Sequence, residues 1–300
     1  MNILLVGCGT WGEKILRELC LLGCTVHITD TAARAREAAL GAGARSAGER
    51  LPDGLKPDGI VIATPASVHR QSVESVLTYG VPVFVEKPMT VSSRDARAIC
   101  AMGGPPVFVM HTWRYHPGVR CLARIAGDRE LGRPLVLRTI RCNWTSPRTD
   151  VDPVWTLLPH DVSIALEILG AIPTPVFAAA EMLGGRPVGL LGLLEHEELK
   201  MIVEVSTRYT DKRREVHLRC EGGVADLPND RDGWVGILRN EDRMGAVERR
   251  CWPTHPGALN LELKAFVDYL NGGAEPKCNA ETGARVVETV EELRALAGIS

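Results

Sequence analysis

The sequence predicts an α/β protein. Its N-terminal domain should hold a doubly wound parallel sheet, and its C-terminal domain should be an α+β unit with an open, mostly antiparallel sheet. The chain has 300 residues, more than one hydrophobic core usually holds, so two domains are expected. Strand and helix patterns alternate at first and then give way to strands in series. We place the domains at residues 1–115 and 116–300, and leave open whether the last helix packs back onto the first domain.

The elements of the N-terminal domain follow one another as strand, helix and strand. The first strand is an uninterrupted apolar run, Asn2–Val6, as is typical of a strand buried on both faces of a parallel sheet. A glycine-rich turn and a helix at Glu13–Leu22 follow it. The other predicted strands are Val26–Thr29, Gly59–Ala63, Val81–Val85 and Val107–Met110, and the other helices are Ala32–Leu40, Ser67–Tyr79 and Ser92–Ala101. This alternation predicts a parallel sheet covered by helices on both faces.

Strands dominate the predicted C-terminal domain. They are expected at Leu135–Cys142, Val176–Leu183, Val188–Leu194, Leu199–Ser206, Val216–Cys220 and Gly223–Leu227, with turns at Gly184-Gly185 and Asp211-Lys212. Helix candidates are sparse after residue 112. One helix at His160–Leu169 precedes most of the strands, and helices at Ala258–Leu270 and Ala280–Leu296 close the chain. Successive strands without intervening helices predict an antiparallel or mixed open sheet.

Composition argues against several classes of partner. The formal net charge of −2 gives no basic field for nucleic acid and no polybasic patch for anionic lipid. The longest apolar runs, such as Val188–Leu194, are too short to span a bilayer, so no membrane partner is expected. The chain enters its first strand at Asn2 without a charged leader, and we therefore expect a cytoplasmic protein without a signal peptide.

Nine cysteines are scattered along the chain without a Cys-x-x-Cys pair. Cys20 and Cys24 are the closest two, and both fall in an apolar stretch between a helix and a strand. Reduced, buried thiols are the expected state of such residues. The alternative, a zinc site, would need clustered ligands, so no metal is expected.

A glycine motif lies where the first predicted strand ends. Gly7-Cys8-Gly9-Thr10-Trp11-Gly12 matches the dinucleotide-binding pattern G-x-G-x-x-G, and the flanking strand and helix meet its structural condition. The first glycine permits a tight turn, the second lets a pyrophosphate approach the backbone, and the third lets the helix pack closely. The helix N-terminus adds free N–H groups and the positive end of its dipole. The motif predicts a Rossmann domain; a glycine turn with an unrelated surface aspartate is the alternative.

Asp30 ends the second predicted strand, about 20 residues beyond the motif, where dinucleotide-binding domains carry an acidic residue. A carboxylate there favours two ribose hydroxyls and repels a 2′-phosphate, which indicates NAD as the cofactor. Arg34 and Arg36 lie close by in the sequence and argue in the other direction. NADP therefore stays the less favoured alternative.

Two further strand ends carry polar motifs. Glu86-Lys87-Pro88 closes a predicted strand, and ligands of open α/β sheets bind at the carboxyl ends of strands. A lysine there can point into the cleft; the alternative is a solvated Lys–Glu pair. Ala63-Thr64-Pro65 closes another strand, and His69 lies at the start of the next helix. For this motif, an ordinary strand exit with an exposed helical histidine is the alternative.

Leu158-Pro159-His160-Asp161 is predicted to open a helix. Proline suits a first helical turn, and Asp161 suits the positive end of the dipole. The helix start explains Pro159 and Asp161 but gives no reason for His160. A histidine has an unperturbed pKa near neutrality, so it could take a proton from an alcohol or return one to a ketone. A satisfied core histidine is the alternative.

These four motifs, in this order and spacing, resemble the glucose–fructose oxidoreductase / inositol dehydrogenase / MocA family over nearly the whole chain. Within it, Trp155-Thr156-Leu157-Leu158-Pro159-His160-Asp161-Val162-Ser163 is similar to a Trp-Asp-Leu-x-Pro-His-Asp-x-Ser pattern of members that act on sugars and nucleotide-linked aminosugars. The segment Trp113-Arg114-Tyr115-His116-Pro117 resembles the one that follows the last Rossmann strand and borders the nicotinamide.

The resemblance implies that Lys87 is the catalytic lysine and that His160 is its acid/base partner. It also implies hydride transfer between nicotinamide and a hydroxyl or ketone of a sugar, cyclitol or nucleotide-linked sugar. Homo-oligomers, dimers or tetramers packed through the open sheet, are common among such proteins. The implied cofactor contacts are Gly7, Gly9, Thr10, Trp11, Gly12, Asp30, Ala63, Thr64, Pro65, His69, Glu86, Lys87, Trp113 and Arg114.

One departure concerns the position four residues before the histidine, where the family often has aspartate and this chain has Thr156. At helical spacing it would face the same way as His160, but a threonine cannot stabilise an imidazolium by charge. The expected substrate contacts are Lys87, Asn143, Trp144, Arg148, Trp155, Thr156 and His160. Two alternatives stay open: a non-catalytic NAD-binding or sensing protein, and a glycosidase that uses tightly held NAD transiently.

Overall fold

The computed structural model describes residues 1–50, 53–144, 151–242 and 245–299. The chain forms two compact units. The first contains Met1–Thr112 and Gly257–Val287, and the second contains Trp113–Pro256 and Glu288–Ser300.

The described part of the first unit contains a six-stranded parallel sheet with the order β3-β2-β1-β4-β5-β6. The chain order reverses between β1 and β4, and the carboxyl ends of strands at such a reversal frame a ligand crevice. The central strands are fully buried, which explains their uninterrupted apolar sequences. The strands are β1 (Asn2–Val6), β2 (Thr25–Thr29), β3 (Ser46–Gly48), β4 (Gly59–Ile62), β5 (Val83–Val85) and β6 (Val107–Val109).

The helices of the first unit follow its strands as the alternating pattern predicts. They are α1 (Thr10–Leu21), α2 (Ala33–Gly41), η1 (Ala66–Val68), α3 (His69–Val76), η2 (Leu77–Tyr79) and α4 (Ser93–Ala101). A distant segment joins them: α7 (Ala258–Leu270) packs against α1, and its buried Phe266 lies 4.9 Å from Phe84 of β5, between ring centroids. Helix α8 (Ala280–Leu296) begins in the first unit and ends in the second.

The described part of the second unit contains an eight-stranded sheet with the order β14-β13-β12-β11-β7-β10-β9-β8. Its pairings are antiparallel except between β7 and β10, which confirms the predicted open and mostly antiparallel sheet. The strands are β7 (Pro134–Trp144), β8 (Thr174–Leu183), β9 (Arg186–His196), β10 (Leu199–Ser206), β11 (Arg208–Cys220), β12 (Gly223–Leu227), β13 (Trp234–Arg239) and β14 (Glu248–Cys251).

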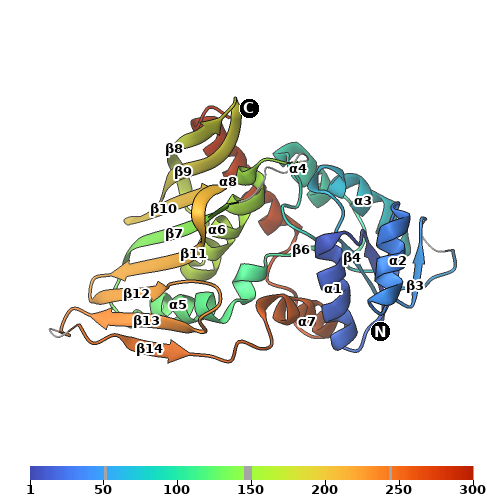
Figure 1. Ribbon diagram of the computed structural model, residues 1–300, viewed down its shortest axis with the longest axis horizontal. Coiled ribbons are helices and arrows are strands. Elements are labelled where there is room, and N and C mark those ends of the chain that lie inside the picture. The colour runs from blue at the N-terminus through green and yellow to red at the C-terminus, as the bar shows by residue number, and fades with distance from the viewer. Residues whose placement is uncertain (51–52, 145–150, 243–244, 300) are drawn as a thin grey trace. The chain divides into compact units, whose positions relative to one another are not determined.

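Helices α5 (Pro117–Gly127) and α6 (Pro153–Leu169) pack on this sheet, and only α6 was predicted from the sequence. Helix α5, preceded by η3 (Thr112–Tyr115), contacts β12 and β13, and α6 contacts β7, β9 and β10 (Figure 1). The signal for α5 was present: Pro117 stands at the helix start, the His116 ring caps it, and Val119, Leu122 and Ile125 repeat at helical spacing and are buried.

The predicted start of α6 was wrong. The helix begins at Pro153, with the Asp152 side chain as its N-cap, so Pro159 is an interior residue. An interior proline removes one backbone hydrogen bond, but the buried face of α6, which includes Trp155 and Leu158, keeps the segment helical. Asp161 is consequently far from the positive end of the dipole, and an ion pair rather than the helix end accounts for it.

The strands differ from the predicted ones in two further respects. The Asp211-Lys212 turn was wrong, because both residues lie within β11, where the pairing with β7 shifts register between Arg208 and Arg213. Three short strands were also missed: β13 and its edge neighbour β14 in this sheet, and the edge strand β3 of the first unit. The Gly184-Gly185 turn is confirmed: both glycines have positive φ and connect β8 to β9. None of the described helices is long and apolar enough to cross a membrane.

Candidate functional site

The glycine loop of the first unit joins β1 to α1. At two of its positions the neighbouring backbone is so close that only glycine fits. Gly7 has a φ of +88°, and a Cβ there would lie 2.8 Å from the carbonyl oxygen of Ala63 at the end of β4. A Cβ on Gly12 would overlap the carbonyl oxygen of Gly7. The chain's own packing therefore explains both glycines.

Gly9 has no such internal explanation. Its φ of −68° suits any residue, and a Cβ there would meet no atom within 4 Å. Gly9 is also the N-cap position of α1, and no side chain caps that helix. The loop thus offers uncapped N–H groups, the positive end of a helix dipole and open space beside the backbone. These features fit a pyrophosphate, the group through which a dinucleotide would approach.

Asp30, at the end of β2, is hydrogen-bonded to the backbone of the glycine loop. Its two carboxylate oxygens accept hydrogen bonds from the backbone N–H groups of Cys8 (2.7 Å) and Ala32 (2.8 Å). Each oxygen keeps a further lone pair for a ribose hydroxyl. Arg36, which the sequence analysis weighed as a 2′-phosphate ligand, donates through Nη1 to the carbonyl oxygens of Asp30 and Thr31. This arrangement favours NAD.

A buried carboxylate connects the glycine loop to Lys87. Glu86, directly after β5, is 6% exposed and accepts hydrogen bonds from the Trp11 indole N–H and from the Lys87 backbone N–H, the latter at 2.9 Å. Burial raises the pKa of Glu86, while the Lys87 charge and the two hydrogen bonds oppose that shift. Trp11 belongs to α1, so one carboxylate fixes the backbone at Lys87 to the first turn of the cofactor-binding helix.

His69 lies at a second connection, between the end of β4 and the loop after Lys87. Its ring is 1% exposed; Nδ1 lies 2.9 Å from the carbonyl oxygen of Pro88, and Nε2 lies 2.9 Å from that of Thr64. A neutral ring donates one of these bonds, and burial, with Lys87 as a lesser cause, lowers the pKa of His69. The placement favours a positioning role for His69 over direct cofactor contact. The Thr64 hydroxyl lies 3.0 Å from that of Ser72.

In the second unit, α6 carries both His160 and Thr156. Asp152 caps the helix through Oδ1, which accepts from the backbone N–H groups of Val154 (2.9 Å) and Trp155 (3.2 Å). The Thr156 hydroxyl donates to the Asp152 carbonyl oxygen at 3.1 Å, so it serves the helix backbone. His160 follows one turn later and is partly exposed. Because residues four apart share a helix face, the two side chains lie on the same side of α6.

A buried ion pair fastens the His160 segment to the sheet. Asp161, next to His160, accepts from Arg141 Nε of β7 at 3.1 Å, and both side chains are almost fully buried. The Arg141 guanidinium also lies over the Trp113 ring, 4.3 Å from its centroid. Trp113 in turn stacks on His116, with ring centroids 5.0 Å apart. This cluster was missed at the sequence level, because nothing local marks Arg141 as the partner of Asp161.

The remaining predicted site residues of the second unit are spread over several environments. Arg114 pairs with Glu167 at 3.1 Å, and both side chains are largely buried. Asn143 Oδ1 accepts from Arg214 at 2.8 Å. Trp144 is exposed beneath the Arg208 guanidinium, whereas Trp155 is buried beside Arg294. Arg148 lies outside the described residues. Lys87 and His160 belong to different units.

The chain is similar to known NAD-binding oxidoreductases. Residues 1–103 match the GFO_IDH_MocA family model, described as an oxidoreductase family with an NAD-binding Rossmann fold. UDP-N-acetylglucosamine 3-dehydrogenase of Acidithiobacillus ferrooxidans is 29% identical over 263 residues, which cover 79% of this chain and 78% of that protein. Inositol 2-dehydrogenase of Ralstonia nicotianae is 25% identical over 305 residues, covering 91% and 87%.

Solved structures share the fold over nearly the full chain. A levoglucosan dehydrogenase in complex with NADH and levoglucosan superposes with a TM-score of 0.87 at 13% identity, covering 99% of this chain and 97% of that one. The crystallised UDP-N-acetylglucosamine 3-dehydrogenase of A. ferrooxidans gives 0.83 at 21% identity, with the same coverage. The Rossmann domain in residues 1–103 is thus similar to the NAD-binding domain of the glucose–fructose oxidoreductase / inositol dehydrogenase / MocA oxidoreductases, and the relatives extend this similarity over most of the chain.

Proposed function

We propose that the chain is an NAD-dependent dehydrogenase. It transfers hydride between nicotinamide and a hydroxyl or ketone of a sugar, cyclitol or nucleotide-linked sugar. The observation that carries the proposal is the uncapped glycine loop at Gly9, connected through Glu86 to the strand end that bears Lys87. The relatives support the substrate class, since they are named as dehydrogenases of UDP-N-acetylglucosamine and of inositol.

The first unit would hold the cofactor. The glycine loop would take the pyrophosphate, and Asp30 would take the ribose hydroxyls. When bound, NAD supplies the hydride acceptor. The other expected contacts are Thr10, Trp11, Ala63, Thr64, Pro65, Glu86, Trp113 and Arg114. The buried His69 ring would position the loop after Lys87 rather than contact the cofactor.

Lys87 and His160 would divide the work on the substrate oxygen. The Lys87 ammonium stabilises the negative charge that develops there, and His160 accepts the hydroxyl proton during oxidation and returns it during reduction. Thr156 offers no charge to an imidazolium, so we expect either that His160 is a weaker base or that Lys87 carries more of the proton transfer. The proposed substrate contacts are Lys87, Asn143, Trp144, Arg148, Trp155, Thr156 and His160.

The test is NADH formation, followed by its absorbance, over a panel of sugars, cyclitols and nucleotide-linked sugars. Lys87→Ala should lower kcat by at least about a hundredfold while leaving NAD affinity measurable, because the ammonium acts on the developing charge. Lys56→Ala is the matched control, a substitution of another first-unit lysine outside the proposed site. Unchanged turnover in Lys87→Ala would remove Lys87 from the mechanism. NAD binding without turnover on any compound would instead favour the non-catalytic alternative.

We further propose that the chain works as a homo-oligomer in the cytoplasm. The support for assembly is a set of exposed apolar side chains on two neighbouring strands, β8 and β9: Val176, Phe177, Met182, Leu183 and Leu191. The support for location is that the nine cysteines, all among the described residues, are free thiols, as is usual in a reducing compartment.

A further inference from the structure

Strand β11 brings a second arginine beside the buried Arg141–Asp161 pair. Arg214 is the direct cross-strand partner of Arg141 in the pairing of β11 with β7, so both side chains stand on the same face of the sheet. Like charges directly opposite each other destabilise a sheet unless something compensates them. The sequence analysis did not single out Arg214.

The nearby carboxylates are already engaged by other cations. Asp161 pairs with Arg141 at 3.1 Å, and Asp230 accepts from Lys212 Nζ at 2.6 Å. Within the described part of the chain, the hydrogen bonds of Arg214 all go to neutral oxygens. These are the carbonyls of Cys142 (2.9 Å) and Arg213 (2.6 Å) and Asn143 Oδ1 (2.8 Å). Arg214 is therefore the cation of this cluster that forms no ion pair with a carboxylate among the described residues.

The environment of Arg214 agrees with that account. Burial, followed by the charge of Arg141, lowers the pKa of Arg214 to about 10, and Asp161 and Asp230 only partly oppose this. A partly buried cation that lacks its own counter-ion is costly, and an anionic ligand would remove that cost.

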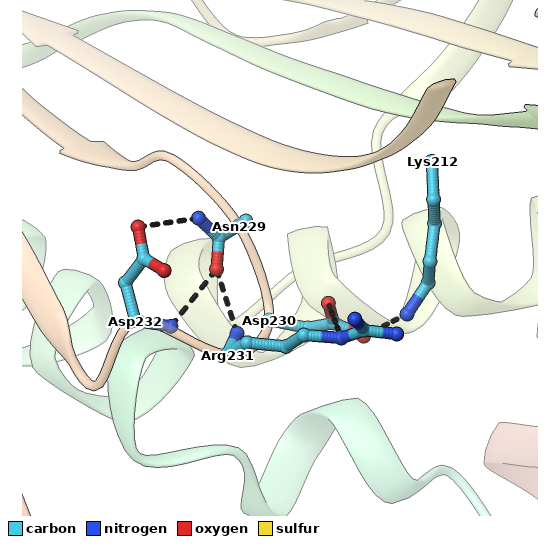
Figure 2. Close-up of a pocket in the computed structure, with 5 residues that line it drawn as sticks. All are labelled: Lys212, Asn229, Asp230, Arg231 and Asp232. Atoms are coloured by element: carbon cyan, nitrogen blue, oxygen red, sulfur yellow. Dashed lines mark hydrogen bonds and ion pairs between the residues drawn. The ribbon is translucent and has the colours of Figure 1, made fainter. Parts of the chain in front are cut away.

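A pocket opens next to this cluster. Figure 2 shows its lining: Lys212 from β11, and Asn229, Asp230, Arg231 and Asp232 from the loop between β12 and β13. Asn229 Oδ1 accepts the backbone N–H groups of Arg231 and Asp232, which gives the loop a defined shape. Both Lys212 and Arg214 lower the pKa of Asp230, so this carboxylate lies within electrostatic range of the two cations.

We infer that Arg214, beside the pocket that Lys212 lines, binds an anionic group of the substrate, either a phosphate or a carboxylate. The inference rests on the proposed dehydrogenase function and narrows its substrates to phosphorylated or nucleotide-linked sugars and sugar acids, ahead of neutral cyclitols. A planar guanidinium suits both anions, because its N–H groups can pair with two oxygens at once. Asn143, which Arg214 orients, would add its amide N–H groups.

Calorimetric titration of the full chain with UDP, which carries a diphosphate, and with D-glucuronate, which carries a carboxylate, tests the inference and distinguishes the two anions. Arg214→Gln should weaken binding of the recognised anion about tenfold or more, and Arg214→Lys should weaken it less. Arg213→Gln is the matched control, since its side chain faces away from Arg214 and pairs with Asp211 at 3.1 Å. Wild-type affinity for the anion should fall as salt rises, a readout that needs no variant.

The outcomes separate this inference from the proposed function. If the wild type binds neither UDP nor glucuronate, or if Arg214→Gln binds them as tightly as the wild type, the inference is overturned. Equal loss in Arg213→Gln would also overturn it. NADH formation from neutral cyclitols alone would retain the dehydrogenase and reject the anion site. Arg214-dependent binding without turnover of any panel compound would retain the anion site and reject the dehydrogenase.

Discussion

At the residue scale, the functional candidates of the first unit owe their positions to hydrogen bonds with the backbone. Glu86 bonds to the Lys87 N–H and the Trp11 indole, and His69 bridges two carbonyl oxygens. A sequence reveals which polar residues follow a strand, and it therefore predicted this cluster. It does not reveal their bonding partners, so it interpreted His69 as an exposed helical residue or a cofactor contact, whereas the ring is buried between two loops.

His69→Ala should lower kcat about tenfold to a hundredfold, because losing the ring frees the loop that carries Lys87 to move. The Kd for NAD should change little, since the ring contacts protein carbonyls, and His69→Gln, which keeps one donor, should recover part of kcat. Steady-state kinetics and a direct NAD titration measure both. His27→Ala, on another first-unit histidine, is the control. A large rise in Kd with intact kcat would show instead that His69 contacts the cofactor.

At the element scale, local sequence patterns predicted the helices and strands that are bounded by glycine or proline. The bounds of the other elements depend on tertiary packing. The buried strands and the β8–β9 turn follow directly from apolar runs and paired glycines. Helix α6 does not, because Pro159 favoured a helix start there, whereas burial of Trp155 and Leu158 sustains the helix from Pro153. The register shift in β11 was beyond prediction, since it depends on pairing with β7, which is distant in sequence.

The pairing of β11 with β12 should make stability depend on pH. His217 Nδ1 lies 2.9 Å from Asp226, and that hydrogen bond, ahead of the one with Glu215, raises the pKa of His217 above its ordinary 6.5. Because the pKa of His217 is raised in the folded state, the stabilisation that its pairing with Asp226 contributes is fully present below pH 6.5. It is lost as the pH rises through the pKa that His217 has in the folded protein. With partial exposure, it should be less than about 1 kcal/mol of unfolding free energy.

Urea unfolding of the wild type and of His217→Gln over this pH range measures that contribution. The stability advantage of the wild type should be larger at about pH 6 than at about pH 9. His196→Gln, on β9, controls for the loss of a partly buried histidine. An advantage that grows with pH, or none at either pH, would show that the Asp226 pairing does not stabilise β11 and β12.

At the scale of the whole molecule, the groups proposed for one reaction are divided between two compact units. The first holds the glycine loop and Lys87, and the second holds His160, Asp161 and the arginine pair. The sequence predicted that these groups lie in two domains, because alternating strands and helices give way to successive strands along the chain. It could not predict that Gly257–Val287 belongs with the first unit, because packing of α7 against α1 joins segments at opposite ends of the chain.

The exposed apolar side chains of β8 and β9 should lie at a contact between copies of the chain. Light scattering should give the wild type a mass that is a multiple of the chain mass. Phe177→Asp combined with Leu191→Asp should reduce it, because charge on a buried apolar contact is unfavourable. Leu40→Asp, at an exposed leucine of α2, is the control. A wild type that is monomeric at all concentrations would contradict the assembly.

The most direct test of the central claim follows deuterium from nicotinamide to substrate. Wild-type protein is incubated with NADH that carries deuterium at both C4 positions and with a panel of keto-sugars, and the product alcohols are analysed by mass spectrometry. The account predicts deuterium at the new carbinol carbon, formed in proportion to the NADH consumed and lost in Lys87→Ala. Product formation without deuterium transfer or net NADH change, or no product from any compound, would contradict it.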